Sequence, residues 1–433
     1  MPKATQRRER RQTIAWPVLV IGTAIVLGGA AMILIAASRS DRLLERANAA
    51  ADRWAAAYWR RPIALQGPAP DSYQPIAKGL RVRDCGSCHA AQLHDWQTSM
   101  HAAAMGPGVA AQLVSMAPEA RADCLICHAP MGEQWASLPR SDGSWAQNPA
   151  YDRALDQEGL VCAACHLRAH VRNGPPLGPG LASVSQMYHG IPQRTPFFEA
   201  SEFCKACHQH TSEFMAPNGK LVENVYQEWL ASPSAAQGVT CQQCHMPQRR
   251  HLWKGIHDPD MTRSGITITT TVTPEATRAG EAARAVLNLR NTGTGHAFPT
   301  YTTPAVRLQI AFLDAAGQLI APEAGAEHVL QRVLDMSTNP WGELRDTRLL
   351  PGQGAEAAFE GVVPAGAATL RFQVRVEPDE FYARFYQDRL RENPMADVAA
   401  QYRIALERAR STPYTLFQRE VPVADNSQSR PRS

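Results

Sequence analysis

Five pentapeptides of one kind follow one another along the chain: Cys85-Gly86-Ser87-Cys88-His89, Cys124-Leu125-Ile126-Cys127-His128, Cys162-Ala163-Ala164-Cys165-His166, Cys204-Lys205-Ala206-Cys207-His208 and Cys241-Gln242-Gln243-Cys244-His245. Together they use all ten cysteines of the protein. Cys-x-x-Cys-His is the pattern by which c-type haem is attached. The two thiols bond the vinyl groups of the porphyrin, and the adjacent histidine faces the iron as its proximal ligand. Five such motifs, with no cysteine left over, predict five covalently bound haems.

Other uses of paired cysteines leave the histidine that ends every motif unexplained. Disulfide bonds do not require a histidine after each second cysteine, and neither does a zinc site built from Cys-x-x-Cys pairs. A thioredoxin-like redox motif normally occurs once, at the start of a helix in a βαβ unit. The sequence therefore favours haem over disulfides, zinc and thiol redox chemistry.

The net charge of the chain is concentrated at its N-terminus. The first eleven residues hold five basic side chains and one glutamate, a local charge of +4 that equals the net charge of all 433 residues. The rest of the chain is formally neutral, and haem propionates would make it more acidic. Nothing in this distribution resembles a nucleic-acid-binding surface. The length predicts two or three domains.

An uncharged segment of 24 residues, from Ile14 to Ala37, follows the basic residues. It is long enough to cross a bilayer as a helix, and the basic flank keeps the N-terminus in the cytoplasm. We therefore expect residues 1–40 to form a single-pass anchor in the inner membrane, with the rest in the periplasm, where c-type haem is attached. The alternative is a cleaved signal peptide, with cleavage after the small residues 36–37 or 47–49, and an exported protein.

The haem-binding domain is expected over residues 81–260, after a helix and linker over 41–80. The motif histidines are spaced by 39, 38, 42 and 37 residues, without self-similar sequence between them. So few residues per haem cannot build a large apolar core. The porphyrin faces must therefore supply much of it, among short helices and long loops. Such a domain should not fold without its cofactor, because binding supplies the folding energy.

The sequence changes character after residue 260. Runs that alternate apolar and polar residues, at 266–272, 285–289, 306–312 and 370–376, are separated by Gly, Asn and Pro clusters. They predict about seven short strands and an Ig-like β-sandwich over 261–378. Residues 379–424 are expected to form helices that Pro394 breaks in two, and the polar tail 425–433 to be disordered. The fold class is therefore mixed.

Nine histidines outside the motifs are available as sixth ligands of the irons. A bis-histidine haem needs one more imidazole, usually from a distant part of the chain, and methionine is the other common ligand. The available methionines near the motifs are Met100, Met105, Met131 and Met246. We favour three histidines: His101 in a predicted helix after the first motif, His189, and His257, which Asp258 could orient.

The other six histidines fall into further ligand candidates and histidines that are not expected to bind iron. His170, His251 and His296 are further candidates, and His296 lies on a predicted turn of the β-domain from which it could reach a haem. The three that we expect to lie on the surface or beside other groups are His94, His210 and His328.

The segment from Cys85 to His101-Ala102-Ala103-Ala104-Met105, with Trp96 between them, resembles the opening of the cytochrome c-554 family of multihaem cytochromes. Asp123 and Gly159-Leu160-Val161, which precede the second and third motifs, continue the similarity over roughly residues 80 to 210. The resemblance implies that His101 serves the third haem and that His170 or His189 serves the fourth. It also implies an open coordination position at the haem on His128. The fifth motif and the β-domain depart from that family.

Electron transfer is the predicted function. Closely packed haems form a series of one-electron sites, and an anchor would keep them beside periplasmic or membrane redox partners. The alternative is an oxidoreductase that acts on a small nitrogen or sulfur compound at one open haem. The sequence has no Cys-x-x-Cys-Lys motif, so a lysine-ligated nitrite-reducing site is not indicated. A third possibility, a subunit of an extracellular haem filament, fits poorly with an uncleaved anchor.

Overall fold

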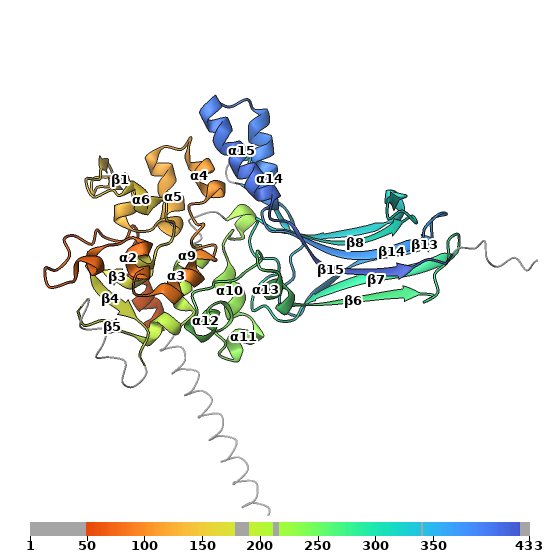
Figure 1. Ribbon diagram of the computed structural model, residues 1–433, viewed down its shortest axis with the longest axis horizontal. Coiled ribbons are helices and arrows are strands. Elements are labelled where there is room, and N and C mark those ends of the chain that lie inside the picture. Colours follow the sequence, from red (N-terminus) through yellow and green to blue (C-terminus); the bar gives the residue numbers. More distant parts are fainter. Residues whose placement is uncertain (1–48, 178–189, 211–215, 339–340, 425–433) are drawn as a thin grey trace, which may run out of the picture. The chain divides into compact units, whose positions relative to one another are not determined.

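The computed structural model describes residues 49–177, 190–210, 216–338 and 341–424 (Figure 1). The predicted anchor at 14–37, the tail 425–433 and His189 lie outside these residues. Among the described helices, none combines the length and the apolar character needed to cross a bilayer. The membrane anchor therefore stays a prediction.

The motif region consists mainly of short helices and loops, as predicted (Figure 1). After a helix over 49–58, the α-helices are α2 (Val82–Gly86), α3 (Ala90–Gln97), α4 (Pro107–Leu113), α5 (Pro118–His128), α6 (Arg153–Asp156), α7 (Cys162–His166), α9 (Glu202–His208), α10 (Val225–Leu230), α11 (Pro233–Ala236), α12 (Cys241–His245) and α13 (Pro259–Ser264). The single-turn 3₁₀ helices are η1 (Pro75–Lys78), η2 (Gly132–Gln134), η3 (Pro196–Glu199), η4 (Pro217–Gly219) and η5 (Pro247–Arg249). Short strands were not predicted here: β1 (Ser137–Pro139), β2 (Trp145–Gln147), β3 (Leu167–Arg168), β4 (Val171–Gly174) and β5 (Gln193–Arg194).

Four of the five motifs end a helix at their histidine, namely in α5, α7, α9 and α12. On a helix, residues three and four apart share a face. The first cysteine, the second cysteine and the histidine of a motif have this spacing, so one helical turn presents both thiols and the imidazole on the same side. The first motif differs, because α2 ends at Gly86 and α3 begins at Ala90.

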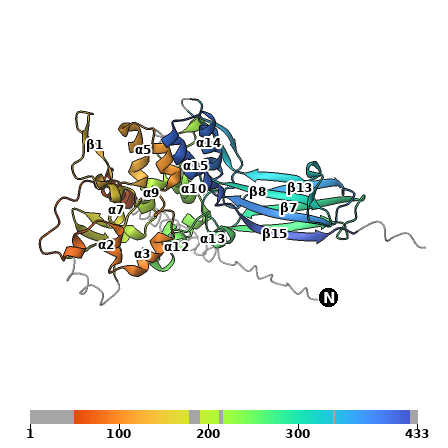
Figure 2. The same cartoon turned by 45° about the horizontal axis from the view of Figure 1, so that its top comes forward.

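The β-domain is a sandwich of two antiparallel sheets (Figure 2). One sheet has the order β13-β7-β6, and the other has the order β10-β8-β14-β15, with β9 paired to β8. With the long strands named as in an Ig domain, and β10 as strand C′, these sheets are E-B-A and C′-C-F-G, an Ig-like arrangement. The elements are β6 (Ile266–Thr273), β7 (Ala282–Asn291), β8 (Ala305–Leu313), β9 (Leu319–Ile320), η6 (Pro322–Ala324), β10 (Ala326–Leu330), β11 (Arg332–Asp335), β12 (Gly342–Asp346), β13 (Gly354–Val362), β14 (Thr369–Glu377) and β15 (Tyr414–Pro422).

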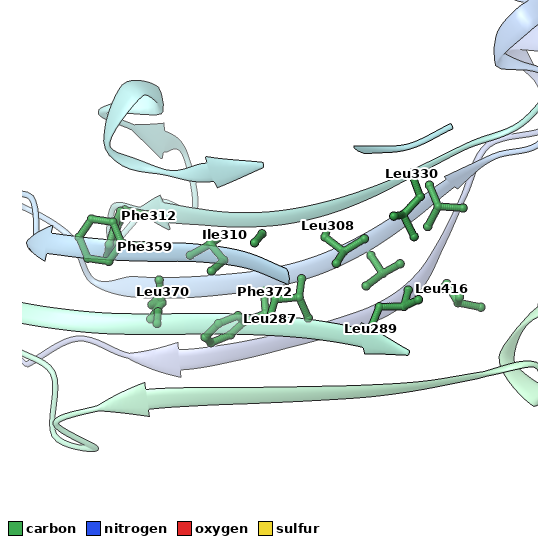
Figure 3. Packing of buried hydrophobic residues seen from close by; sticks show 14 of the residues in the cluster. Leu287, Leu289, Leu308, Ile310, Phe312, Leu330, Phe359, Leu370, Phe372 and Leu416 are labelled. Atoms are coloured by element: carbon green, nitrogen blue, oxygen red, sulfur yellow. The ribbon is translucent and has the colours of Figure 1, made fainter. Parts of the chain in front are cut away.

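The core of the sandwich lies between the two sheets (Figure 3). Alternate residues of β7, such as Leu287 and Leu289, are fully buried, and so are Leu308 of β8 and Phe372 of β14. This alternation follows from the period of two along a strand, which turns every second side chain toward the core. The predicted strand runs are confirmed on this point.

The C-terminal region contains two helices and a strand. The helices α14 (Glu380–Arg391) and α15 (Ala396–Arg410) are separated at Pro394, as predicted. They pack on α4 through an apolar cluster that includes Ala111, Tyr386 and Tyr402. The prediction was wrong for residues 414–422, which form β15 and pair antiparallel with β14. The pairing is with a strand far earlier in the chain, so local sequence did not reveal it.

Arg332 of β11 joins the β-domain to the motif region. Its side chain has no exposed surface and lies 2.6 Å from the carboxylate of Glu343. Its guanidinium also donates to the backbone carbonyls of Lys220, at 2.8 Å, and Leu221, at 2.6 Å. One buried side chain therefore fixes residues 220–221, which follow the fourth motif.

We predict that Arg332→Leu lowers the free energy of unfolding by about 3 kcal/mol, because removing one partner of a buried pair leaves the other groups unsatisfied. Urea unfolding of the mature protein, followed by circular dichroism, measures the change. Arg384→Leu is the matched control, since Arg384 is an exposed helix residue paired with Glu380 and should contribute about 0.5 kcal/mol or less. Equal losses in the two variants would contradict this role of Arg332.

Candidate functional site

A single large cavity of about 2860 Å³ connects the five motifs. Pockets for ordinary small ligands have volumes of about 300–1,000 Å³, so this cavity has room for several large planar groups. All ten cysteines and all five motif histidines line it. The side chains that would attach and ligate haem therefore face one shared space, and the residues fit the predicted cofactor.

Four motif histidines are oriented by hydrogen bonds in which their Nδ1 atoms take part. In a ligand imidazole, the nitrogen that does not bind the metal usually donates to a carbonyl or carboxylate, which fixes the tautomer and the ring. Three of them donate from Nδ1 to backbone carbonyls: His128 to Ala104 at 2.8 Å, His166 to Asn173 at 2.8 Å and His245 to Lys254 at 2.7 Å. In each of these rings Nε2 remains for the iron.

His208 of the fourth motif has a different partner. Its Nδ1 lies 2.6 Å from the hydroxyl of Tyr301, a residue of the β-domain. A tyrosine hydroxyl can accept a hydrogen bond and donate another, whereas a carbonyl can only accept. No sequence pattern predicts this contact, because it joins two distant segments.

Three motif histidines each face a second imidazole at nearly the same spacing. With metal–nitrogen bonds of about 2 Å on each side and ring centroids about 1 Å further out, two ligands of one iron have centroids about 6 Å apart. The observed centroid distances are 6.1 Å for His166 and His251, 6.3 Å for His245 and His296, and 6.4 Å for His208 and His101. This spacing is what bis-histidine ligation at the third, fifth and fourth motifs would require.

His101 reaches the cavity from a turn beyond the end of α3, not from the predicted helix. Its carbonyl accepts a hydrogen bond from Leu160 N at 3.1 Å. Gly159, with φ of 71°, permits this approach, since a Cβ there would lie 2.9 Å from the same carbonyl oxygen. Burial lowers the pKa of His101 to about 3, so the ring is in the neutral form that binds metals. The resemblance assigned His101 to the third haem, but the structure places it opposite His208 of the fourth motif.

Asp95 of α3 positions His251 beside His166 of the third motif. Asp95, buried in that helix, accepts a hydrogen bond from the backbone N–H of His251 at 3.1 Å. The same carboxylate binds the Arg250 guanidinium, with Nε to Oδ2 at 2.7 Å. This ion pair keeps the pKa of Asp95 below its usual range. Asp95 was not singled out from the sequence, because its partners lie far along the chain.

His296 comes from the β-domain, as the sequence suggested. The residue lies in the turn between β7 and β8, and its Nδ1 contacts the carbonyl of Ala297 at 3.0 Å and the hydroxyl of Thr300 at 3.1 Å. These contacts leave Nε2 as the free ring nitrogen. The β-domain thus supplies an imidazole opposite His245 of the fifth motif.

Two other histidines differ from their predicted roles. His170 does not line the cavity; its Nε2 lies 3.0 Å from the carbonyl of Gly67 and its ring is buried. We therefore remove His170 from the ligand candidates. His257 does line the cavity, but Asp379 contacts its Nε2 at 3.1 Å. Asp258, the predicted partner, instead caps α13 by accepting from Met261 N.

The first and second motifs are not completed by the described residues. Within these residues, no imidazole takes the corresponding place opposite His89 or His128. The predicted ligand His189 lies outside the described chain. Near the second motif, half-buried Tyr382 of α14 lies close to Cys124.

Cysteines of motifs that are far apart in the sequence lie close together. The first motif is close to the third, the second to the fourth, and the fourth to the fifth, through the pairs Cys85 and Cys162, Cys127 and Cys207, and Cys204 and Cys241. Cys165 of the third motif lies close to both cysteines of the fourth. The fourth motif therefore contacts the second, the third and the fifth.

We predict that His101→Ala, His251→Ala and His296→Ala each convert one low-spin haem to high-spin, because each removes one imidazole of a facing pair. Electron paramagnetic resonance of the oxidised protein measures this change. His170→Ala is the matched control, since that histidine is also buried but lies outside the cavity, and it should leave the spectrum unchanged. A high-spin signal in His170→Ala, or none in His251→Ala, would contradict these assignments.

No protein-family model matches the chain. The chain is similar to the cytochrome c nitrite reductase subunit NrfA of Nitratidesulfovibrio vulgaris, with 28% identity over 166 residues, which are 32% of this chain and 30% of that protein. The chain thus spans less than a third of that relative. Its structure is similar to the crystal structure of a penta-heme cytochrome c552 from Thermochromatium tepidum, with a TM-score of 0.54 and 20% identity, over 81% of this chain and all of that one.

The second likeness shows a shared fold. The five motifs, the facing imidazoles and this fold together support a multihaem c-type cytochrome. The resemblance to the cytochrome c-554 family and the count of five haems stay predictions.

Proposed function

We propose that the protein is a pentahaem c-type cytochrome that passes electrons between redox partners. Bound haem supplies one-electron oxidation and reduction at iron. The observation that carries the proposal is the set of three facing imidazole pairs. With haem bound, the two histidines of each pair would hold the iron between them, so substrate could not bind there without displacing a ligand. Three of the five motifs are therefore arranged for electron transfer.

The contacts between motifs support a continuous path for electrons. The first motif touches the third through Cys85 and Cys162, and the third lies beside the fourth through Cys165. The second and the fifth motifs both adjoin the fourth. We infer that the fourth motif is a branch point, with the third on one side and the second and fifth on others. The chain supplies this path by fixing the cysteines that hold each cofactor.

We further propose that the protein works at the periplasmic side of the inner membrane. The segment 14–37 and its basic flank support a single-pass anchor, and c-type haem is attached outside the cytoplasm. An anchor would keep the haem region close to membrane redox partners. If the N-terminus is cleaved, the same domain would act as an exported protein.

A second function is favoured by one observation. In the described part of the chain, His89 and His128 lack a facing imidazole, so one of these irons could take a small nitrogen or sulfur compound. The NrfA relative is named as a nitrite reductase subunit, but this sequence lacks a Cys-x-x-Cys-Lys motif. An oxidoreductase with a different substrate is therefore the alternative.

Cyanide and nitric oxide separate these functions, because both bind an iron that has an open position. If electron transfer is the sole function, ligands outside the described residues, such as His189, complete the irons at His89 and His128. We then predict that the oxidised wild-type protein shows no cyanide-induced change in its absorption spectrum, and that the reduced protein shows none with nitric oxide. His101→Ala is the positive control, since it opens one iron and should bind one equivalent. Stoichiometric binding to the wild-type protein would overturn electron transfer as the sole function and favour the oxidoreductase.

A further inference from the structure

Glu223 is a half-buried residue whose carboxyl group the electron-transfer path does not use. The residue lines the cavity, and its backbone carbonyl accepts a hydrogen bond from His210 N at 2.8 Å. This bond places Glu223 beside the end of the fourth motif. Its Oε2 atom is buried and has no hydrogen-bond partner within the described chain. An unpartnered polar atom in such a position needs an explanation.

The nearby arginines compensate the charge of Glu223 only in part, because both also bind other groups. Arg332 binds Glu343 and backbone carbonyls, and Arg348 binds Asp346 at 2.9 Å and lies 3.5 Å from Glu228. A carboxylate whose charge is compensated only in part favours its protonated form in such surroundings. Burial, followed by the charge of neighbouring groups, raises the pKa of Glu223 well above its usual range.

Glu223 faces groups from several elements. The titratable and charged ones are Cys127 of α5, Glu228 of α10, Tyr301 in the turn before β8, Arg332 of β11, Arg348 after β12 and Tyr382 of α14. Once haem is attached, Cys127 becomes a thioether and no longer titrates. The arginines keep their charge at any physiological pH, and burial raises the pKa values of both tyrosines above their usual range. Glu223 is then the group of this set in which burial and neighbouring charge favour the uptake of a proton.

The charge of this carboxyl acts on the fourth motif through Tyr301, with which it interacts electrostatically. Tyr301 lies 2.6 Å from His208 Nδ1, and Glu223 is the nearby charge with the largest effect on Tyr301. When His208 donates from Nδ1, the hydroxyl accepts, and its own hydrogen is free to point to a carboxyl group. The fourth motif is thus the one whose histidine contacts a group that can both accept and donate.

We propose that Glu223 is a proton-binding site coupled to the electron at the fourth motif. The Glu223 carboxylate takes one proton from solvent as the site at His208 gains one electron from a donor redox protein, and it releases that proton when the electron leaves for an acceptor. Added negative charge nearby favours the protonated carboxyl, and its loss favours the carboxylate. This inference rests on the proposed electron-transfer function and deepens it, because it makes the branch point sensitive to pH.

The test is spectroelectrochemical titration of the complete haem-loaded protein from mildly acidic to mildly alkaline pH. In the wild type, the equilibrium constant for reducing one haem should fall up to tenfold per pH unit where Glu223 titrates, which is about 59 mV for a one-electron couple. Glu223→Gln should abolish this dependence for that haem. Glu133→Gln is the matched control, since Glu133 is also a buried carboxyl with an unpartnered Oε2 but does not line the cavity, and it should keep the wild-type dependence.

A second measurement can be made on the wild type alone and then compared with the variant. Redox-induced infrared difference spectra of the wild type should show the carbonyl stretch of a protonated carboxyl group, gained on reduction and lost on oxidation, and this band should be absent from Glu223→Gln. A wild type that lacks the band, or a variant with unchanged pH dependence, would overturn the proton site. Either result with every haem still reducible leaves electron transfer intact, whereas haems that accept no electrons would overturn the proposed function itself.

Discussion

Covalent attachment at pairs of cysteines three residues apart is the constraint that shapes the motif region. A helical turn brings both thiols and the following histidine to one face, and four short helices end at that histidine. The motif region does not need longer helices or a continuous apolar core for its stability, because bound cofactor would fill the cavity that the motifs share. Thioether bonds therefore do here what packed side chains do in an ordinary domain.

The β-domain completes the haem region. Its turn between β7 and β8 carries His296, which faces the fifth motif, and Tyr301, which contacts the fourth. The hairpin of β11 and β12 carries Arg332, whose guanidinium donates to the carbonyl of Leu221, two residues before Glu223. The sandwich has a core of its own, so it can hold these three side chains on a rigid support. Positions on rigid elements are better defined than positions on loops alone.

Local patterns in the sequence predicted the elements, and contacts between distant segments decided the site. Strand alternation identified the sandwich, and Pro394 marked the break between α14 and α15. By contrast, His101 faces the fourth motif and not the third, and His170 packs outside the cavity. The positions of these histidines depend on hydrogen bonds between distant residues. An example is the bond from His251, after the fifth motif, to Asp95, and no periodic sequence pattern predicts it. The strand at 414–422 was missed for the same reason.

Intact-mass measurement of the purified mature protein shows whether its cysteines hold haem, and a pyridine haemochrome assay of the same sample counts iron porphyrin independently. We predict that every cysteine is bound as a thioether, with five haems on each chain. Three or fewer haems, or thiols that are free or paired with one another in a fully matured sample, would contradict it.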